Sequence, residues 1–496
     1  MKDPNHDLSC GHAGGEAAAR LAVIDPPCPN TPAPLLRHLL EALSKHWGPV
    51  FAQKRTAARA VSLAVGLLLG VGRRTITRAL CFHGKVQQDW SADYKLFSRS
   101  LWDEQALFGG IVTQLVQAGA LGGEVVAVAW DDTAVPRRGK HIAGGQWMRD
   151  SMGPPFHVNL IWGQRFLQGS VLCPLYEQDG ESSPRAIPVV FREVPAVKKP
   201  GKRAKPEAWA SYKEAKKKHN LSVAALAQFE KMREHFDARG LAHLILLHTV
   251  DASYMNRTTL ACELERALLL GRVRKDAKLC YPAPPGGRRV YGKRKFTPES
   301  VARDQRRKWK TLTVFHGGQY RKVRYKEVKK VLWQGGGRRR LLRLIVVAPV
   351  AYRTTKTGKT YYREKAYLLC TDQDLDVATL LQKYFDRWQI EYNHRDEKDI
   401  LGVGQAQVRN ELSTPRVPAL RVATYSQMLV SALILYGPQR SEAYLPLPCW
   451  RSPTKRASCQ DMVNLLRQQA AHHPEVLQTA LDSAADLEIM CLSAAA

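Results

Sequence analysis

Two short apolar runs, each followed directly by an aspartate, constrain the fold of this chain most strongly. The run VVAVAW covers Val125 to Trp130 and leads into Asp131, and LAHLILLHTV covers 241–250 and leads into Asp251. Runs this short and this rich in branched apolar residues are typical of strands buried on both faces. We predict two buried strands of a central sheet, each ending at a carboxylate.

The rest of the chain divides by composition. With 496 residues, it is long enough for two to four domains. We expect six segments: a flexible tail rich in Pro, Gly and Ala (1–35), a helical domain (36–118), the first part of an α/β core (119–270), a basic β-rich insertion (271–345), the second part of the core (346–440) and a C-terminal helical region (441–496).

A polar stripe is encoded in the stretch YFDRWQIEYNHRDEK. Tyr384, Arg387, Glu391 and Lys398 lie 0, 3, 7 and 14 residues along it. On a helix that turns ~100° per residue, these side chains share a stripe about 60° wide, and Arg395 joins them. One carboxylate among groups that hold phosphate fits a nucleic-acid site. An ordinary solvated helix face has similar spacings, so the stretch alone leaves both interpretations open.

The charge of the chain indicates a polyanionic partner. The formal net charge is +30, and residues 271–346 hold 24 Lys or Arg against 4 Asp or Glu. Aromatic residues, among them Trp309 and Trp333, are interleaved with these cations, which favours a folded DNA-gripping segment over a disordered tail. A second basic stretch, 192–219, has ten Lys or Arg and three Glu.

Other classes of protein fit less well. We expect no membrane partner, because no apolar run approaches the ~18–20 residues of a spanning helix. The ten cysteines are scattered without a C-x-x-C pair, which argues against a disulfide framework or a zinc site. No apolar leader follows the N-terminus, so cytoplasmic residence is the expectation.

Three carboxylates at the predicted sheet suit metal-dependent phosphodiester chemistry. Asp131, Asp251 and Glu391 provide hard oxygen ligands, the kind that Mg²⁺ prefers. Two such ions ~3.5–4 Å apart can clamp the attacking and leaving oxygens of a phosphodiester. We therefore predict two Mg²⁺ ions, with Mn²⁺ as a substitute, and Arg387 and Lys398 as phosphate contacts.

Both aspartate assignments have alternatives. Asp132 could serve in place of Asp131, but neighbouring side chains on a strand face opposite ways, so only one of them can join the cluster. Asp251 could instead cap a following helix, a common role for aspartate. The buried strand before Asp251 favours a metal ligand.

These motifs resemble those of a known family. The Y-x2-R-x3-E-x6-K spacing is met in full by Tyr384, Arg387, Glu391 and Lys398, and resembles the signature of bacterial insertion-sequence DDE transposases of the cut-and-paste type. WDDT resembles their first-aspartate motif and selects Asp131, whereas TVDASYMNR resembles the second and selects Asp251.

The resemblance implies an α/β fold, with an RNase H-like mixed-sheet catalytic core, a β-rich basic insertion and a helical N-terminal domain. It also implies Mg²⁺-dependent cleavage at insertion-sequence ends and strand transfer into target DNA. We expect double-stranded DNA as the partner, a homodimer on that DNA, and a nucleoid-associated location in the bacterial cytoplasm.

Further DNA contacts are expected outside the carboxylates. In the helical domain, Arg73, Arg74 and Arg78 are predicted to lie closest to DNA. The resembled subgroup releases its element through a terminal hairpin, for which Trp309 or Trp333 could stack on an extruded base; alternatively, both tryptophans are core residues of a small β domain. Two other interpretations remain open: a catalytically inactive DNA-binding descendant, and an RNase H-like nuclease or resolvase.

Overall fold

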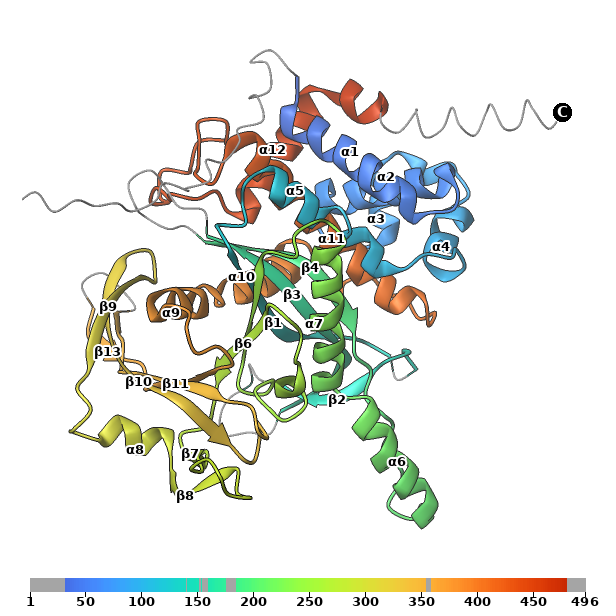
Figure 1. Ribbon diagram of the computed structural model, residues 1–496. Helices are drawn as coiled ribbons and strands as arrows, with labels where there is room; N and C mark the ends of the chain where they lie inside the picture. The colour runs from blue at the N-terminus through green and yellow to red at the C-terminus, as the bar shows by residue number, and fades with distance from the viewer. Residues whose placement is uncertain are drawn as a thin grey trace, which may run out of the picture.

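A twelve-stranded mixed sheet forms the centre of the computed structural model (Figure 1), which describes residues 32–139, 141–150, 153, 159–174, 184–353 and 358–479. The middle of the sheet consists of β1 (Val125–Pro136), β3 (Leu160–Cys173), β4 (Arg185–Glu193), β5 (Ile245–Val250) and β6 (Ala267–Arg272). The predicted α/β class is confirmed. The predicted tail lies almost wholly outside the described residues.

The strand directions in the middle of the sheet are those of an RNase H-like core. Strands β1, β3 and β4 pair in antiparallel fashion, whereas β1, β5 and β6 run parallel. Parallel neighbours need a crossover, and α7 (Leu221–Asp237) lies between β4 and β5 in the chain. This helix packs on the sheet: the ring centre of its Phe229 lies 5.0 Å from the ring centre of Trp130.

Strand β1 is buried on both faces. Val126, Val128 and Trp130 belong to one hydrophobic cluster, and the alternate residues Ala127 and Ala129 belong to a second one. Side chains alternate between the faces of a strand, so each cluster covers one face of the sheet. The larger side chains pack on the side of α7, and the alanines pack on the side that includes Ile390.

The basic insertion continues this sheet. Its strands are β7 (Leu279–Pro282), β8 (Tyr291–Phe296), β9 (Lys310–Phe315) and β10 (Tyr320–Trp333), with α8 (Pro298–Arg303) between β8 and β9. They are joined to β6 through β11 (Leu342–Val347) and β14 (Ala366–Cys370). A separate hairpin pairs β12 (Ala351–Arg353) with β13 (Thr360–Tyr362), and β2 (Gln146–Arg149) pairs with β3.

The two ends of the described chain meet in one helical layer (Figure 1). The layer contains α1 (Pro34–Trp47), α2 (Lys54–Leu69), α3 (Ile76–Phe82), α4 (Ser91–Ser98), α5 (Ile111–Gln117), α11 (Ser413–Tyr436) and α12 (Cys459–His472). Gln469 of α12 accepts a 2.9 Å hydrogen bond from the Leu36 backbone, and Arg467 donates to the Leu69 carbonyl at 3.0 Å.

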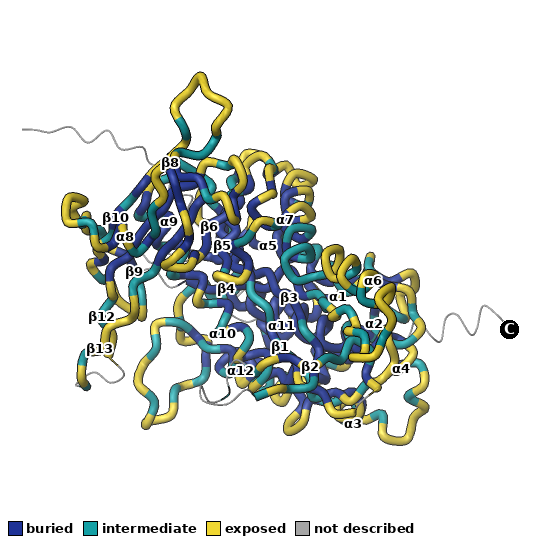
Figure 2. The backbone as a smooth tube through the Cα atoms, turned by 90° about the horizontal axis from the view of Figure 1, so that it is seen from below, coloured by how far each residue is buried: buried dark blue, intermediate teal, exposed yellow. Residues whose placement is uncertain are grey.

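Helix α11 corrects one expectation from the sequence. Its 24 residues are long and apolar enough to match a membrane span by length and composition, although 94% of its most apolar window is buried within the protein. Arg416 lies in this helix and donates to the carbonyls of Phe97 and Trp102. The helix is therefore a core element, and the buried interior runs from the sheet into it (Figure 2).

Candidate active site

Asp131 and Asp251 occupy equivalent positions on neighbouring parallel strands. The last paired residues of β1 and β5 are Trp130 and Val250, and the two aspartates follow them directly. Neighbouring strands lie about 4.8 Å apart, so the aspartates start from adjacent backbone positions. Asp131 does not end its strand as predicted, because β1 continues to Pro136 while paired with β3 alone.

The carboxylates of Asp131 and Asp132 have different partners. Asp132 accepts a 3.1 Å hydrogen bond from the Tyr254 hydroxyl and lies 3.4 Å from the Arg165 guanidinium. Burial raises the pKa of Asp131 to about 7; Arg387 opposes this rise, whereas Asp132 and Asp251 add to it. Of these two aspartates, Asp131 is therefore the one whose charge interacts with Arg387.

Asp251 does not cap a helix. Its side chain makes no hydrogen bond or ion pair with any other residue in the described part of the chain. The next helical segment is a single 3₁₀ turn, Thr259–Ala261, and its N-terminal neighbour Thr258 makes no side-chain cap. The Asp251 carboxylate is therefore available for a ligand.

The signature residues do not lie on one continuous helix. Helix α9 (Val377–Asp386) ends before α10 (Gln389–Arg395), and a π-helical turn (Asp396–Ile400) follows. At the break, the Trp388 amide donates to the Phe385 carbonyl at 3.2 Å, a tighter pattern than that of an α-helix. The single stripe predicted from ideal spacing is therefore wrong in detail.

Glu391 nevertheless interacts with the aspartates. It lies in the first turn of α10, half-buried, 4.0 Å from the Arg387 guanidinium. Burial raises its pKa, Arg387 lowers it, and Asp251 raises it further. Charge interactions therefore connect Asp131 to Asp251 and Asp251 to Glu391. Within the described residues, however, no three His, Cys, Asp or Glu side chains converge closely enough to hold one ion.

The basic and phenolic members of the signature surround these carboxylates. Burial lowers the pKa of Lys398, and neighbouring carboxylates that include Asp131 raise it in turn. Burial raises the pKa of Tyr384, and Arg272 and Arg387 oppose the shift. Arg395 instead lies over the ring of its neighbour Tyr392, with its guanidinium carbon 4.9 Å from the ring centre.

A buried polar network fixes α10 against the sheet. Gln168, the β3 residue opposite Asp131, donates to Glu397 at 3.0 Å, and Ser170 donates to Asn393 at 3.1 Å. Asn393 in turn donates to the carbonyl of Ala186 in β4 at 3.0 Å. This network was not predicted from the sequence; the signal for it was a pair of polar residues, Gln168 and Ser170, two positions apart in an apolar strand.

A basic and aromatic cavity of about 490 Å³ lies beside the carboxylates. Arg272, Arg363 and Arg387 line it together with aromatic residues from α9, from the break after it and from the β12–β13 hairpin. The Arg363 guanidinium lies 5.4 Å from the ring centre of Trp388 and 5.6 Å from that of Tyr352. Planar cations and aromatic rings on one wall suit both phosphates and bases.

The other predicted DNA contacts fall into two groups. Arg73 and Arg78 are exposed, whereas Arg74 is 7% exposed and donates to the Ile400 carbonyl, so its guanidinium lies inside the protein. Trp309 and Trp333 are partly buried and pack against the main hydrophobic cluster. Arg74 therefore lies inside the protein, contrary to its predicted contact with DNA, whereas the packing of both tryptophans fits the alternative in which they are core residues.

A comparison with known families identifies the family of this chain. The family described as DDE superfamily endonuclease matches residues 48–340, more than half of the chain. The match includes Asp131 and Asp251 and ends before Glu391. No curated protein matches the sequence. Enzymes of this superfamily generally use divalent metal ions and act on DNA, and this chain belongs to the DDE superfamily endonucleases.

Proposed function

We propose that this chain is a transposase that cuts DNA at the ends of an insertion sequence and joins those ends to target DNA. One observation carries the proposal: Asp131 and Asp251 stand in register on parallel strands, and the Glu391 carboxylate interacts with Asp251 from the helix packed beside them. Arg387 and Lys398 add positive charge at the same place.

The three carboxylates have the donor chemistry of a site for divalent metal ions, although among the described residues they do not converge on one point, so ions or DNA would have to draw them together. Their oxygens are hard donors, and the pKa of Asp131 is raised mainly by its burial and further by Asp132 and Asp251, while Arg387 opposes the rise. Asp131, Asp251 and Glu391 would hold two Mg²⁺ ions, or Mn²⁺ in their place. When bound, such ions activate the attacking oxygen and stabilise the leaving oxygen of a phosphodiester.

The protein's own side chains position the substrate. Arg387 and Lys398 are suited to hold the non-bridging oxygens of the scissile phosphate, because both lie close enough to interact with the Asp131 charge. The cavity that contains Arg272 and Arg363 would take the nucleotides at the end of the DNA. Asn393 holds α10, and with it Glu391, in place, and Gln168 holds the π-helical turn that follows α10.

The remaining positive charge would grip the duplex. The insertion holds most of the charge surplus, and α6 (Pro206–Lys218) adds a helix in which no residue is buried. A pair of ends must be held together for transfer, so we propose a homodimer on DNA. The cell compartment that follows from this proposal is the bacterial nucleoid.

A cleavage assay tests this function. The purified chain is mixed with duplex DNA that carries the inverted repeats flanking its gene, with Mg²⁺, with Mn²⁺ or with a chelator. We expect strand cuts at the repeat boundary and joined products with target plasmid, both abolished by the chelator. Binding without cuts would instead favour a catalytically inactive DNA-binding protein, and cuts at branched DNA without joining would favour a resolvase.

A further inference from the structure

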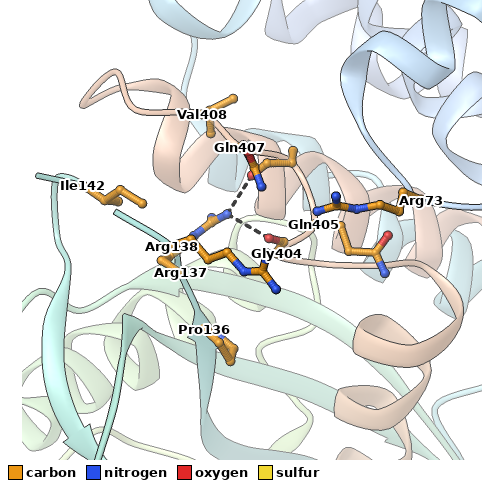
Figure 3. A pocket seen from close by; sticks show the side chains of 10 residues that line it. Arg73, Pro136, Arg137, Arg138, Ile142, Gly404, Gln405, Gln407 and Val408 are labelled. Atoms are coloured by element: carbon orange, nitrogen blue, oxygen red, sulfur yellow. Dashed lines mark hydrogen bonds between the residues drawn. The ribbon is translucent and has the colours of Figure 1, made fainter. Parts of the chain in front are cut away.

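A second cavity, of about 200 Å³, lies where the N-terminal helices meet the catalytic sheet (Figure 3). Its walls come from the loop between α2 and α3 at Arg73, from the end of β1 at 136–138, and from residues 404–408. Three arginines line this cavity, together with two glutamines and no carboxylate. Such a lining attracts an anion.

One of the three arginines builds the wall. Arg137 is 9% exposed and donates to Gln164 at 2.8 Å. It also donates to the carbonyls of Gly404 and Ala406 at 3.3 and 3.0 Å (Figure 3). It thereby fixes the 404–408 segment against β1. Arg73 and Arg138 are exposed, and their side chains have no hydrogen bond or ion pair within the part of the chain that the structure describes.

The glutamines add hydrogen-bond donors to this cavity. The Gln405 side-chain oxygen accepts a 2.7 Å hydrogen bond from the Arg74 backbone amide. The amino group of the same side chain has no partner among the described residues. Gly404 makes the close approach possible: its φ is +97°, and a Cβ there would lie 2.6 Å from Val135. Only glycine suits that backbone, so the close packing of the 404–408 segment against β1 depends on Gly404.

We propose that this cavity binds one backbone phosphate of the DNA duplex, held jointly by Arg73 from the N-terminal helices and Arg138 from β1. The inference rests on the proposed function. The volume of about 200 Å³ is below the ~300 Å³ at which small-molecule pockets begin, so it suits a hydrated phosphodiester better than a nucleotide. Free guanidinium and amide donors are the groups that hold phosphate oxygens.

The position of this cavity gives the bound phosphate a role. Asp131 and Pro136 are five residues apart on β1, or about 17 Å at ~3.4 Å per residue. For a duplex whose axis follows β1, a rise of ~3.4 Å per base pair puts the bound phosphate about five base pairs from the cut. Because one phosphate is held by both the helical layer and the catalytic sheet, it fixes the distance between the sequence bound by the helices and the bond that is cleaved.

Binding measurements on three variants test the inference. Full-length Arg73→Gln, Arg138→Gln and the double variant are titrated with flanking-repeat duplex over a range of salt concentrations. Each single change is expected to weaken binding roughly tenfold and to lower the salt slope by about 0.9, the value for one phosphate. The double variant should bind only slightly more weakly than either single variant, because both arginines hold the same group.

Arg55→Gln is the matched control. It removes the same charge from the exposed start of α2, about 21 Å along the helix from its other end. We expect its affinity and salt slope to equal those of the unchanged protein. If the variants have the same affinity and salt slope as this control, or if the two single effects multiply in the double variant, Arg73 and Arg138 do not hold one phosphate together.

Ethylation of individual DNA phosphates gives a second readout on the unchanged protein. Modification of a phosphate about five base pairs from the cut should weaken binding roughly tenfold, and the double variant should be insensitive to it. Interference confined to other positions would refute the inference while leaving the proposed function intact. If the unchanged protein neither binds nor cuts the duplex, both fail.

Discussion

The side-chain amide of Gln168 donates a 3.0 Å hydrogen bond to the carboxyl group of Glu397, which is 1% exposed. Gln168 stands opposite Asp131 on the neighbouring strand, and Glu397 lies in the π-helical turn that also contains Lys398. This bond therefore connects the strand that carries the first aspartate to the turn that carries the signature lysine. Short π-helical turns often occur at functional sites.

The protonation of Glu397 predicts a pH-dependent stability. Burial raises its pKa to about 8, and Gln168 and Lys398 oppose the rise. In the unfolded chain this group loses its proton near its ordinary pKa of 4.5. Between those two values the folded state binds the additional proton, so raising the pH favours unfolding; above pH 8 the effect is constant.

Glu397→Gln should remove this dependence, because an amide stays neutral and can still accept the bond from Gln168. From pH 5 to pH 8, the free energy of unfolding of the variant minus that of the unchanged protein should increase by at most about 4 kcal/mol. Urea unfolding at the two pH values measures the difference, with the exposed Glu411→Gln as control. If the two proteins differ in free energy of unfolding by the same amount at both pH values, Glu397 is not protonated in the folded state as assigned.

The three carboxylates should be needed for cleavage and not for DNA binding. Asp131→Asn, Asp251→Asn and Glu391→Gln each remove a charged oxygen donor with little change in volume, and each should lower the cleavage rate by at least 1000-fold, consistent with the several kcal/mol that a bound metal ion supplies. Gel-shift affinity for the repeat duplex, measured in chelator, should change less than about threefold, a small fraction of the binding free energy.

Asp132→Asn is the informative comparison for that experiment. Asp132 is held by Tyr254 and Arg165, so its replacement should lower stability and leave substantial cleavage at low temperature. A complete absence of cleavage in a folded Asp132→Asn protein, together with an active Asp131→Asn protein, would exchange the roles of the two residues.

Local sequence patterns predicted the elements of the site better than their junctions. Apolar runs identified β1 and β5 because burial on both faces leaves a continuous apolar stretch. Periodicity could not show that β1 continues to Pro136, since its later residues pair only with β3, which lies far along the chain. The break at Arg387 also follows ordinary helix-forming residues, so no local signal announced it.

The same limit applies to individual side chains. Arg74 and Arg73 are adjacent and chemically identical, but Arg74 points to Ile400, more than three hundred positions away, and Arg73 lines a cavity. By composition Trp309 is a reasonable stacking residue, yet the buried Lys326 lies over its ring at 4.6 Å. Such outcomes depend on tertiary packing that charge and spacing do not encode.

Helix α6 should contribute to DNA affinity through charge alone. It projects from the body of the protein (Figure 1), none of its 13 residues is buried, and its last turn contains Lys216, Lys217 and Lys218. Replacing all three by glutamine should lower the salt slope of binding by about 0.9 for each DNA phosphate that these lysines neutralise, without changing sequence preference.

Unfolding of this triple variant should match that of the unchanged protein, because the three lysines pack against nothing in the core. The control removes three exposed cations, Lys45, Lys54 and Arg55, from the N-terminal helices. If the salt slope falls equally in both triple variants, α6 has no special role in holding DNA.

The cavity beside the carboxylates predicts how the second strand is cut. If the element is released through a terminal hairpin, the end base pairs must open, and an extruded base needs an aromatic surface. Trp388 is 41% exposed, lines this cavity and directly follows Arg387, so it offers that surface where Trp309 and Trp333 do not. Stacking of one base is worth about 1–3 kcal/mol.

Trp388→Ala should therefore reduce hairpin formation roughly tenfold or more while leaving the first nick almost unchanged. On a denaturing gel, the unchanged protein should give a transient product of twice the strand length, and the variant should accumulate nicked strands with free 3′ ends. Trp450→Ala, which removes an 81% exposed tryptophan outside the cavity, serves as control. If the unchanged protein yields nicks but never the double-length strand, the hairpin route is wrong; if both variants form it normally, Trp388 is not the stacking surface.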